Sequence, residues 1–221
     1  SMAAAGPELY DALQTLLGDG TKFTELGLTL SDPSPRAEDA FLVHETNLGV
    51  AFWCIPLLFK HVSQRFVVET DASELLRLTT VGLLINADNY TMLARRKQAL
   101  IDGILDASTE VKFLDLVFSK HPKSDEAWEH RRFVLRTWFA QLEQSTPEGD
   151  GGTARHGIID HELQVCTRMA RQYPRNYYAW THRQWLAARM TREQLLTDAH
   201  SVLDWLNRHV SDATACQYLG C

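Results

Sequence analysis

The motif Pro-x5-Trp-x-His-Arg occurs twice in this chain, with the second copy 52 residues after the first. The first copy lies in KHPKSDEAWEHRR (120–132) and the second in QYPRNYYAWTHRQ (172–184). Self-similarity at a fixed spacing is the sequence signature of a repeat fold, so the motif indicates a tandem structural unit. Its positions are Pro122, Trp128, His130 and Arg131 in the first copy and Pro174, Trp180, His182 and Arg183 in the second.

Two weaker copies extend the repeat. INADNYTMLARRK (85–97) aligns with Ala87 at the Pro position, Leu93 at the Trp position and Arg96 at the Arg position. HVSDATACQYL (209–219) aligns with Val210 at the Pro position. The intervals between the Pro positions are 35, 52 and 36 residues. The long interval contains residues 143–157, a segment rich in Gly, Ser, Thr and Pro that we interpret as a loop inserted into one repeat.

Each copy predicts a pair of helices. Apolar residues recur three and four apart in segments 72–85, 109–120, 157–172 and 191–208, which favours a first helix in each. A capping residue type then opens a second helix: Asn89, Ser124, Asn176 or Asp212. The expected fold is all-α, a right-handed α-solenoid of helical hairpins. Residues 71–221 would hold three full repeats and a truncated fourth, and residues 1–70 a capping helical segment with loops.

Composition narrows the class of protein. The formal net charge of −6 argues against nucleic acid or an anionic membrane as a partner, because both attract basic surfaces. The longest apolar run, LGVAFWCIPLLF (48–59), is shorter than a membrane span, and we interpret it as a buried helix. The four cysteines form no C-x-x-C pair, which favours free thiols in a reducing, cytoplasmic compartment. No metal site is expected, because the sequence holds no H-E-x-x-H motif.

The repeated side chains have a structural interpretation. A tryptophan at one position of every second helix is expected to wedge between neighbouring helices and bury a large area. The arginine three residues later lies on the same helix face, and we expect it to tie one hairpin to the next through a carboxylate or a backbone carbonyl. The histidines are interpreted as interface residues rather than as acids or bases. These residues are Trp128, His130, Arg131, Trp180, His182, Arg183 and Arg96.

The order of the motif, with Pro six residues before Trp at one helix start, resembles the repeat of protein prenyltransferase α subunits. The resemblance covers about residues 72–212. It implies a crescent of hairpins that wraps a β subunit carrying the catalytic zinc, so that this chain needs no cofactor and is inactive alone. It further implies transfer of a C15 or C20 isoprenyl group, with C20 favoured, from its diphosphate to a protein cysteine. The implied partner is the β subunit of the Rab geranylgeranyltransferase.

The resemblance also implies site residues. Lys123, directly after the Pro of its repeat, matches the lysine that reaches the isoprenoid diphosphate; its position before a helix N-terminus also suits a phosphate. Asp125 departs from the family pattern, and its carboxylate would either repel the diphosphate or pair with Lys123. Tyr177 and Tyr178 match a pair that faces the active site, although packing at a helix start explains them equally well. Arg175 follows the next Pro and would add positive charge.

A second function remains open. Cys216 and Leu219 stand where the fourth copy should have its aromatic residue and its arginine, and the family continues with further hairpins. An incomplete end would leave the apolar faces of the last helices open. The alternative to a catalytic subunit is therefore a helical-repeat scaffold that binds a partner protein and performs no chemistry.

Overall fold

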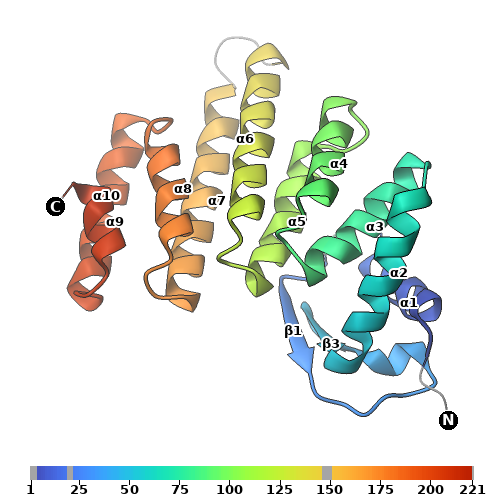
Figure 1. Cartoon of the computed structure of the whole chain (residues 1–221). Coiled ribbons are helices and arrows are strands. Elements are labelled where there is room, and N and C mark those ends of the chain that lie inside the picture. Colours follow the sequence, from blue (N-terminus) through green and yellow to red (C-terminus); the bar gives the residue numbers. More distant parts are fainter. Residues whose placement is uncertain (1–3, 19–21, 146–150, 221) are drawn as a thin grey trace.

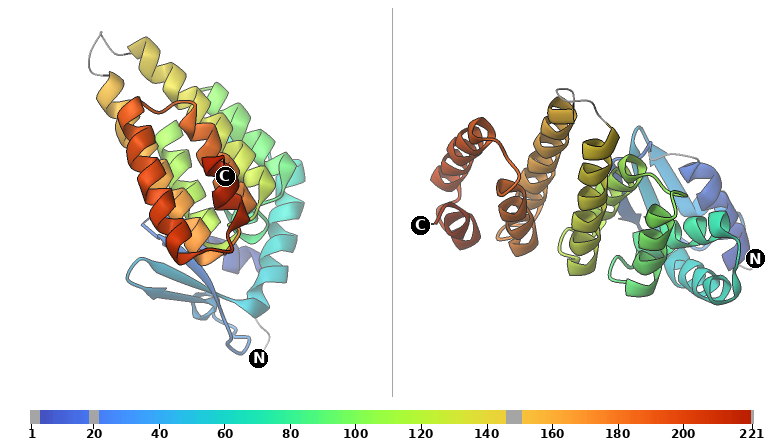
Figure 2. Two further views of the ribbon diagram at one scale, coloured as in Figure 1. Left: turned by 90° about the vertical axis from the view of Figure 1, so that its left-hand side faces the viewer. Right: turned by 90° about the horizontal axis from the view of Figure 1, so that it is seen from above.

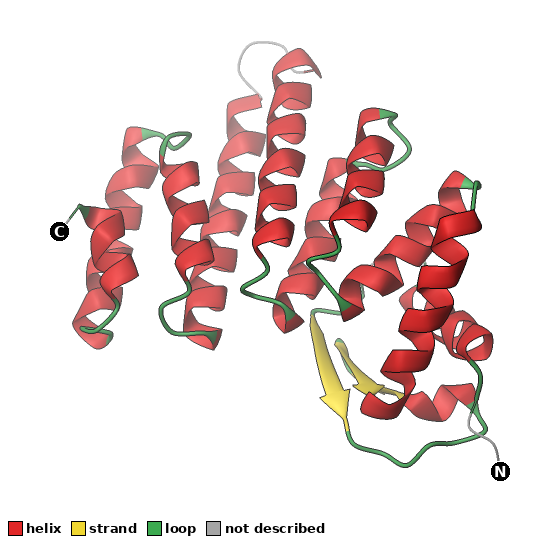
Figure 3. Ribbon diagram, viewed as in Figure 1, coloured by secondary structure: helices red, strands yellow, loops and turns green. Residues whose placement is uncertain are grey.

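The structure, a computed structural model, describes residues 4–18, 22–145 and 151–220. Antiparallel helix pairs stand side by side in a row, and a small sheet lies at its N-terminal end (Figures 1 and 3). This all-α repeat architecture agrees with the fold class predicted from the sequence. The helices are α1 (Gly6–Leu17), α2 (Ile55–Val68), α3 (Ala72–Ile85), α4 (Tyr90–Ile101), α5 (Ala107–Lys120), α6 (Asp125–Ser145), α7 (Gly151–Gln172), α8 (Tyr177–Ala187), α9 (Arg192–Arg208) and α10 (Ala213–Leu219).

The helix boundaries follow local chemistry. Asn89, Asn176 and Asp212 each accept a backbone N–H from the residue three positions on, which pairs one of the donors that a helix start leaves free. Ser124 does the same for Ala127 at the start of α6. These are the caps predicted from the sequence. The first helix predicted at 72–85 coincides with α3, and the others agree to within a few residues apart from the start of α7.

The hairpins α3–α4, α5–α6, α7–α8 and α9–α10 build two layers. In one layer α3 contacts α5 and α5 contacts α7; in the other, α4, α6, α8 and α10 contact one another in order. Seen from above, the pairs follow one another from the N-terminal end to the C-terminal end (Figure 2). Each repeat therefore contacts mainly its neighbours, as in other helical repeat proteins.

Tryptophans of the repeat motif fill the spaces between hairpins. Trp128 is fully buried; its ring stacks on Phe118 with centroids 4.1 Å apart and lies 5.0 Å from the ring of His182 in the next hairpin. Its Nε1–H donates to the carbonyl of Pro122 at 2.9 Å. Trp180 occupies the corresponding place one hairpin later and is also buried. One indole thus joins its own hairpin to the following one.

The N-terminal segment contains a sheet that the sequence analysis did not predict. Strands β1 (Glu25–Thr29) and β2 (Phe41–His44) flank β3 (Asn47–Ala51), with β1 parallel and β2 antiparallel to β3. The strands are four or five residues long, so the inward side chains are too few to give a clear period of two. The expectation of helices and loops alone in residues 1–70 was therefore incomplete.

The interpretation of residues 48–59 as one helix was also wrong. Leu48–Ala51 belongs to β3, and α2 begins only at Ile55. Pro56 lies in the first turn of α2, where its missing N–H costs no hydrogen bond. The proline thus marks the start of a helix.

The sheet is part of the same body as the repeats. β1 packs on α5, where the backbone N–H of Leu26 donates to Ser119 Oγ at 2.9 Å. Helix α1 packs on α2 and α3, and Tyr10 donates to Glu74 at 3.1 Å. Buried apolar residues from α1 to α8 form one continuous core. The boundary predicted at residue 70 therefore does not divide the chain into two hydrophobic cores.

The prediction of a loop over the whole of 143–157 was wrong, because both ends of this segment are helical. Helix α6 runs to Ser145 and α7 begins at Gly151, while 146–150 lie outside the described residues. Long-range contacts favour the helical form of this polar segment. Arg155 pairs with Glu143 at 2.9 Å and lies over the ring of Phe139 at 5.0 Å, which ties α7 to α6.

Replacing Trp128 with Ala should lower the free energy of unfolding by about 3–5 kcal/mol, because the void left by the indole lies between two hairpins. Urea unfolding followed by circular dichroism would measure the change. Phe52→Ala serves as a control for loss of an aromatic ring, since Phe52 is 61% exposed and its loss should cost less than about 0.5 kcal/mol. Equal stability of the two variants would contradict the packing role of Trp128.

Candidate functional site

Buried carboxylates join the motif arginines to the following hairpins. Each arginine lies on the second helix of one hairpin, and its acidic partner lies on the first helix of the next. All of these side chains are at most 4% exposed, so they cannot reach a substrate. The pairs, with their shortest N–O distances, are Arg96–Glu110 at 2.5 Å, Arg131–Glu162 at 2.6 Å and Arg183–Asp198 at 2.6 Å.

Each carboxylate also accepts a hydrogen bond from within its own hairpin. The donor stands 20 residues later in every case: His130 Nε2 to Glu110 at 2.7 Å, His182 Nε2 to Glu162 at 2.9 Å and the Tyr218 hydroxyl to Asp198 at 2.5 Å. Tyr218 occupies the histidine position of the fourth copy of the motif. We call these arginine–carboxylate–donor sets the carboxylate ladder.

The acids of the ladder were missed in the sequence analysis. Glu110, Glu162 and Asp198 do not share a residue type or one interval to the motif arginine, so no motif includes them. Their constant interval of 20 residues to the histidine or tyrosine was the signal that could have revealed them. Asp115 adds a second carboxylate to Arg131, at 2.9 Å, and also lies 2.9 Å from His161 Nε2.

The two glutamates of the ladder, Glu110 and Glu162, are ionised. Burial alone would raise the pKa of Glu110, but the charge of Arg96 and the hydrogen bond from His130 outweigh it and bring that pKa to about 2. Arg131 and His182 bring the pKa of Glu162 to about 2 in the same way. Because an ionised carboxylate only accepts hydrogen bonds, the Nε2 atom of each histidine carries the proton.

Both ladder histidines are fully buried. The Nδ1 atoms of His130 and His182 are buried and have no hydrogen-bond partner among the described residues. A second proton on Nδ1 would therefore be a buried donor without an acceptor. Burial lowers the pKa of His182 below its ordinary value. These histidines act in packing, since neither can exchange a proton with a substrate.

Lys123 lies in the loop between α5 and α6 and is exposed. Its Nζ is 5.4 Å from the centroid of the Tyr173 ring, at the end of the next first helix. Hydrogen bonds fix the backbone around it: Ser124 donates to Asp88 at 2.5 Å, and Asn176 donates to the Pro122 carbonyl at 2.9 Å. The loops of three successive hairpins are thereby aligned along one edge of the row.

The other predicted site residues lie in the neighbouring loop and at the start of α8. Arg175 is exposed and has a left-handed backbone with φ of 59°. Tyr177 is 57% exposed, while Tyr178 packs partly against the core with its ring centroid 5.6 Å from that of Tyr177. Within the described residues, neither tyrosine nor Arg175 forms a hydrogen bond or ion pair with Lys123.

Asp125 is exposed at the first position of α6, next to Glu126. Over the described ranges its carboxylate forms no ion pair with Lys123. Both carboxylates lie near the positive end of the helix dipole, where negative charge is stabilised. They therefore compete with any external anion for this helix start. Lys123 remains available to bind a ligand, but two negatively charged side chains follow it closely in the sequence.

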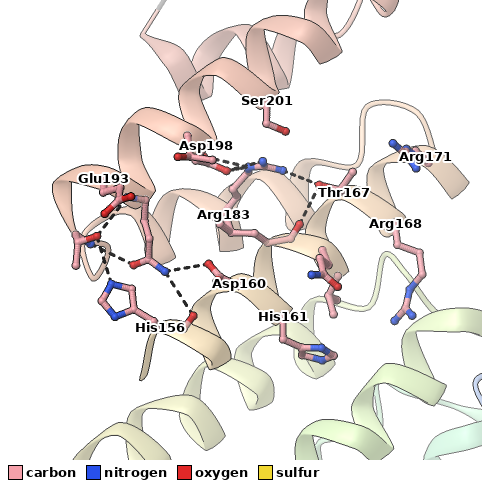
Figure 4. Close-up of a pocket in the computed structure, with 16 residues that line it drawn as sticks. His156, Asp160, His161, Thr167, Arg168, Arg171, Arg183, Glu193, Asp198 and Ser201 are labelled. Carbon is pink, nitrogen blue, oxygen red and sulfur yellow. Dashed lines mark hydrogen bonds and ion pairs between the residues drawn. The ribbon is translucent and has the colours of Figure 1, made fainter. Parts of the chain in front are cut away.

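Two open grooves lie elsewhere on the first-helix layer. One, of about 900 Å³, runs between α7 and α9 (Figure 4). The other, of about 710 Å³, lies between the sheet and the C-terminal half of α7. We call them the α7–α9 groove and the sheet groove. Across residues 4–18, 22–145 and 151–220, no cluster of three or more His, Cys, Asp or Glu side chains could hold a metal ion.

Comparison with known proteins identifies the repeat. The family described as "Protein prenyltransferase alpha subunit repeat" matches residues 107–138 and 159–190. These ranges correspond to the hairpins α5–α6 and α7–α8, and each contains one full copy of the motif. The chain therefore carries protein prenyltransferase alpha subunit repeats.

Named relatives agree with this assignment of the repeats. "Protein prenyltransferase alpha subunit repeat-containing protein 1" from Homo sapiens is 31% identical over 98% of this chain and 60% of the human protein. The Danio rerio protein of the same name is 32% identical over 88% of this chain and 49% of its own length. "Protein prenyltransferase alpha subunit repeat-containing protein 1-B" from Xenopus laevis is 29% identical over 88% and 48%. The chain thus spans about half to three fifths of these relatives.

In the prenyltransferase alpha subunit repeats of this chain, the motif therefore divides into two parts. Its Trp, His and Arg residues are buried between hairpins, whereas Lys123 and Arg175, each next to a motif proline, are exposed. Within the described part of the chain, no helix is both long enough and apolar enough to cross a membrane.

The carboxylate ladder predicts a loss of stability in acid. Histidine has an ordinary pKa of 6.5 and folded His182 a lower one, so the unfolded chain binds more protons as the pH falls through 6.5 and stability decreases. Glu110 and Glu162, with ordinary pKa values of 4.5 and folded values of about 2, stabilise the fold above pH 4.5 and lose this contribution as the pH falls towards 2.

His182→Gln tests the first of these effects, because glutamine can still donate to Glu162 but does not titrate. Between about pH 7 and pH 5, one proton changes the free energy of unfolding by up to about 1.4 kcal/mol per pH unit. We expect this slope, measured by urea unfolding, to be flatter in the variant than in the unmodified protein. His200→Gln, an exposed position on α9, should leave the slope unchanged. An unchanged slope in His182→Gln would refute the assignment.

Proposed function

We propose that this chain is the α-like subunit of a heterodimeric protein prenyltransferase and is inactive alone. Its hairpins would support a β subunit that supplies the zinc and most of the isoprenoid pocket, and Lys123 would face the diphosphate. The proposed reaction transfers a geranylgeranyl group to a protein cysteine. The proposed partner is the β subunit of the Rab geranylgeranyltransferase.

The observation that carries this proposal is the placement of Lys123. It directly follows the motif proline inside a matched family repeat, it is exposed, and no carboxylate among the described residues pairs with it. The hydrogen bonds that Ser124 and Asn176 make to adjacent loops fix the backbone on which it stands. A lysine held in this way keeps its charge free for a ligand outside the chain.

The chemistry expected of Lys123 is electrostatic. As the carbon–oxygen bond to the diphosphate breaks and a carbon–sulfur bond to the cysteine forms, negative charge accumulates on the departing diphosphate. An ammonium group fixed beside that oxygen stabilises the transition state more than the ground state. Arg175 and the exposed ring of Tyr177 could flank the same ligand, because they lie in the next loop along the edge.

The scaffold alternative is favoured by one observation. Asp125 and Glu126 place two carboxylates in the first turn of the helix that Lys123 precedes, and these charges oppose a bound diphosphate. In that case the row of hairpins would bind a partner protein without catalysis. The two functions differ in whether Lys123 affects turnover.

Co-expression with prenyltransferase β subunits tests the proposal. We expect a stable complex on size-exclusion chromatography and transfer of labelled geranylgeranyl diphosphate to a cysteine-bearing protein. In single-turnover assays, Lys123→Ala should slow transfer by about 10²-fold, as for loss of one charge-stabilising group, and leave the complex intact. Asp125→Asn should not slow it, because the substitution removes an opposing charge.

Lys112→Ala is the matched control, since Lys112 is an exposed lysine on α5 of the same repeat. Its transfer rate should equal that of the unmodified complex. A complex that forms but shows the same rate in Lys123→Ala would refute the catalytic role and leave the scaffold function. Absence of any complex with the β subunits tested would refute the heterodimer.

A further inference from the structure

The two grooves of the first-helix layer meet at the same pair of side chains. Arg168 and Arg171 line both the α7–α9 groove and the sheet groove. They are three residues apart on α7 and therefore share one helix face. A ligand that occupies both grooves must cross these two guanidinium groups. Figure 4 shows them together at one side of the α7–α9 groove, opposite Glu193 and His156.

These two arginines differ from the arginines of the carboxylate ladder. Both are exposed, and the nearest carboxylate oxygen to Arg168 is that of Asp115, at 3.9 Å. Asp115 is already held by Arg131 and His161, each at 2.9 Å. Arg171 forms no ion pair within the described residues. Arg168 thus has one distant carboxylate that two closer groups already hold, and Arg171 has none among the described residues.

We propose that the two grooves together bind an extended, acidic segment of a partner protein, with its carboxylates on Arg168 and Arg171. Guanidinium groups bind carboxylates through paired, charge-assisted hydrogen bonds, which gives both affinity and orientation. The proposal does not depend on prenyl transfer, because it uses neither Lys123 nor its loop.

The shape and lining of the grooves favour a polypeptide over a small molecule. The two grooves, of about 900 and 710 Å³, share Arg168 and Arg171 in their linings, and together they are larger than a typical small-molecule site. The α7–α9 groove presents exposed Gln164, Thr197 and Ser201, which can hydrogen-bond a peptide backbone. The sheet groove adds Leu42, 61% exposed, as a contact for an apolar side chain.

Charge in the grooves also excludes nucleic acid and orients the bound segment. Glu193 and Asp160 line the α7–α9 groove and Glu25 lines the sheet groove, so a uniformly charged phosphate backbone would meet repulsion on both sides of the arginines. A protein segment can avoid this repulsion, because it can carry acidic residues at the arginines and neutral or basic residues elsewhere. Its acidic residues should lie at the junction, and its residues near Glu193 should be neutral or basic.

Selection from a phage-displayed library of random twelve-residue peptides tests the proposal with the full chain as bait. We expect enrichment of peptides that contain Asp or Glu next to an apolar residue. Fluorescence anisotropy with the enriched peptides should then show that Arg168→Glu with Arg171→Glu raises Kd by about tenfold or more. Thermal unfolding of this double variant would establish that it remains folded.

The matched control is Lys60→Glu with Arg95→Glu, which makes the same change in net charge at exposed sites on α2 and α4. It should leave Kd unchanged, and higher salt should weaken binding of the unmodified protein. No enrichment, no preference for acidic peptides, or retained affinity in the folded Arg168/Arg171 variant would overturn the proposal. Equal competition by a single-stranded RNA oligonucleotide would overturn it as well.

Discussion

The buried contact between a motif arginine and a carboxylate of the next hairpin is the interaction on which the repeat architecture depends. Neither charge could be buried alone, because removing one partner from such a pair typically destabilises a protein by about 3–5 kcal/mol. Glu162 meets this requirement with Arg131 on one side and His182 on the other. These hydrogen bonds hold adjacent hairpins together at one defined place, close to the tryptophan that fills the space between them.

Fixed stacking has a consequence for the loops. Because each hairpin is held in one register, the turns between first and second helices are aligned along a single edge, and Ser124–Asp88 and Asn176–Pro122 hydrogen bonds connect them. Lys123 and Arg175 stand on this edge. Arg168 and Arg171, which are also exposed, lie on the first-helix layer instead. The chain thus offers two separate basic surfaces despite its net negative charge of −6.

The sequence predicts the repeats far better than the parts that join them. Helices and caps such as Asn89 and Asp212 depend on neighbouring residues, and the periodicity of 72–85 is a local property. The sheet was missed because strand β1 is stabilised by β3 and α5, which are distant in sequence. The ladder acids were missed for the same reason: Glu162 is recognisable only when its contacts with Arg131 and His182 are known. The motif predicts where Lys123 stands in its repeat. It does not predict which side chains surround the lysine, such as Tyr173, because these contacts are known only from the structure.

The asymmetry of the ladder has an evolutionary consequence. At each of the three junctions the arginine lies on the second helix of one hairpin and the acid on the first helix of the next, so the faces that meet are of the same two kinds. Duplication or loss of α5–α6 or α7–α8, which carry both an acid and an arginine, would therefore join an existing arginine to an existing acid and leave no buried charge unpaired. Gene rearrangements in units of one hairpin can lengthen or shorten such a protein, whereas deletions that divide a hairpin cannot.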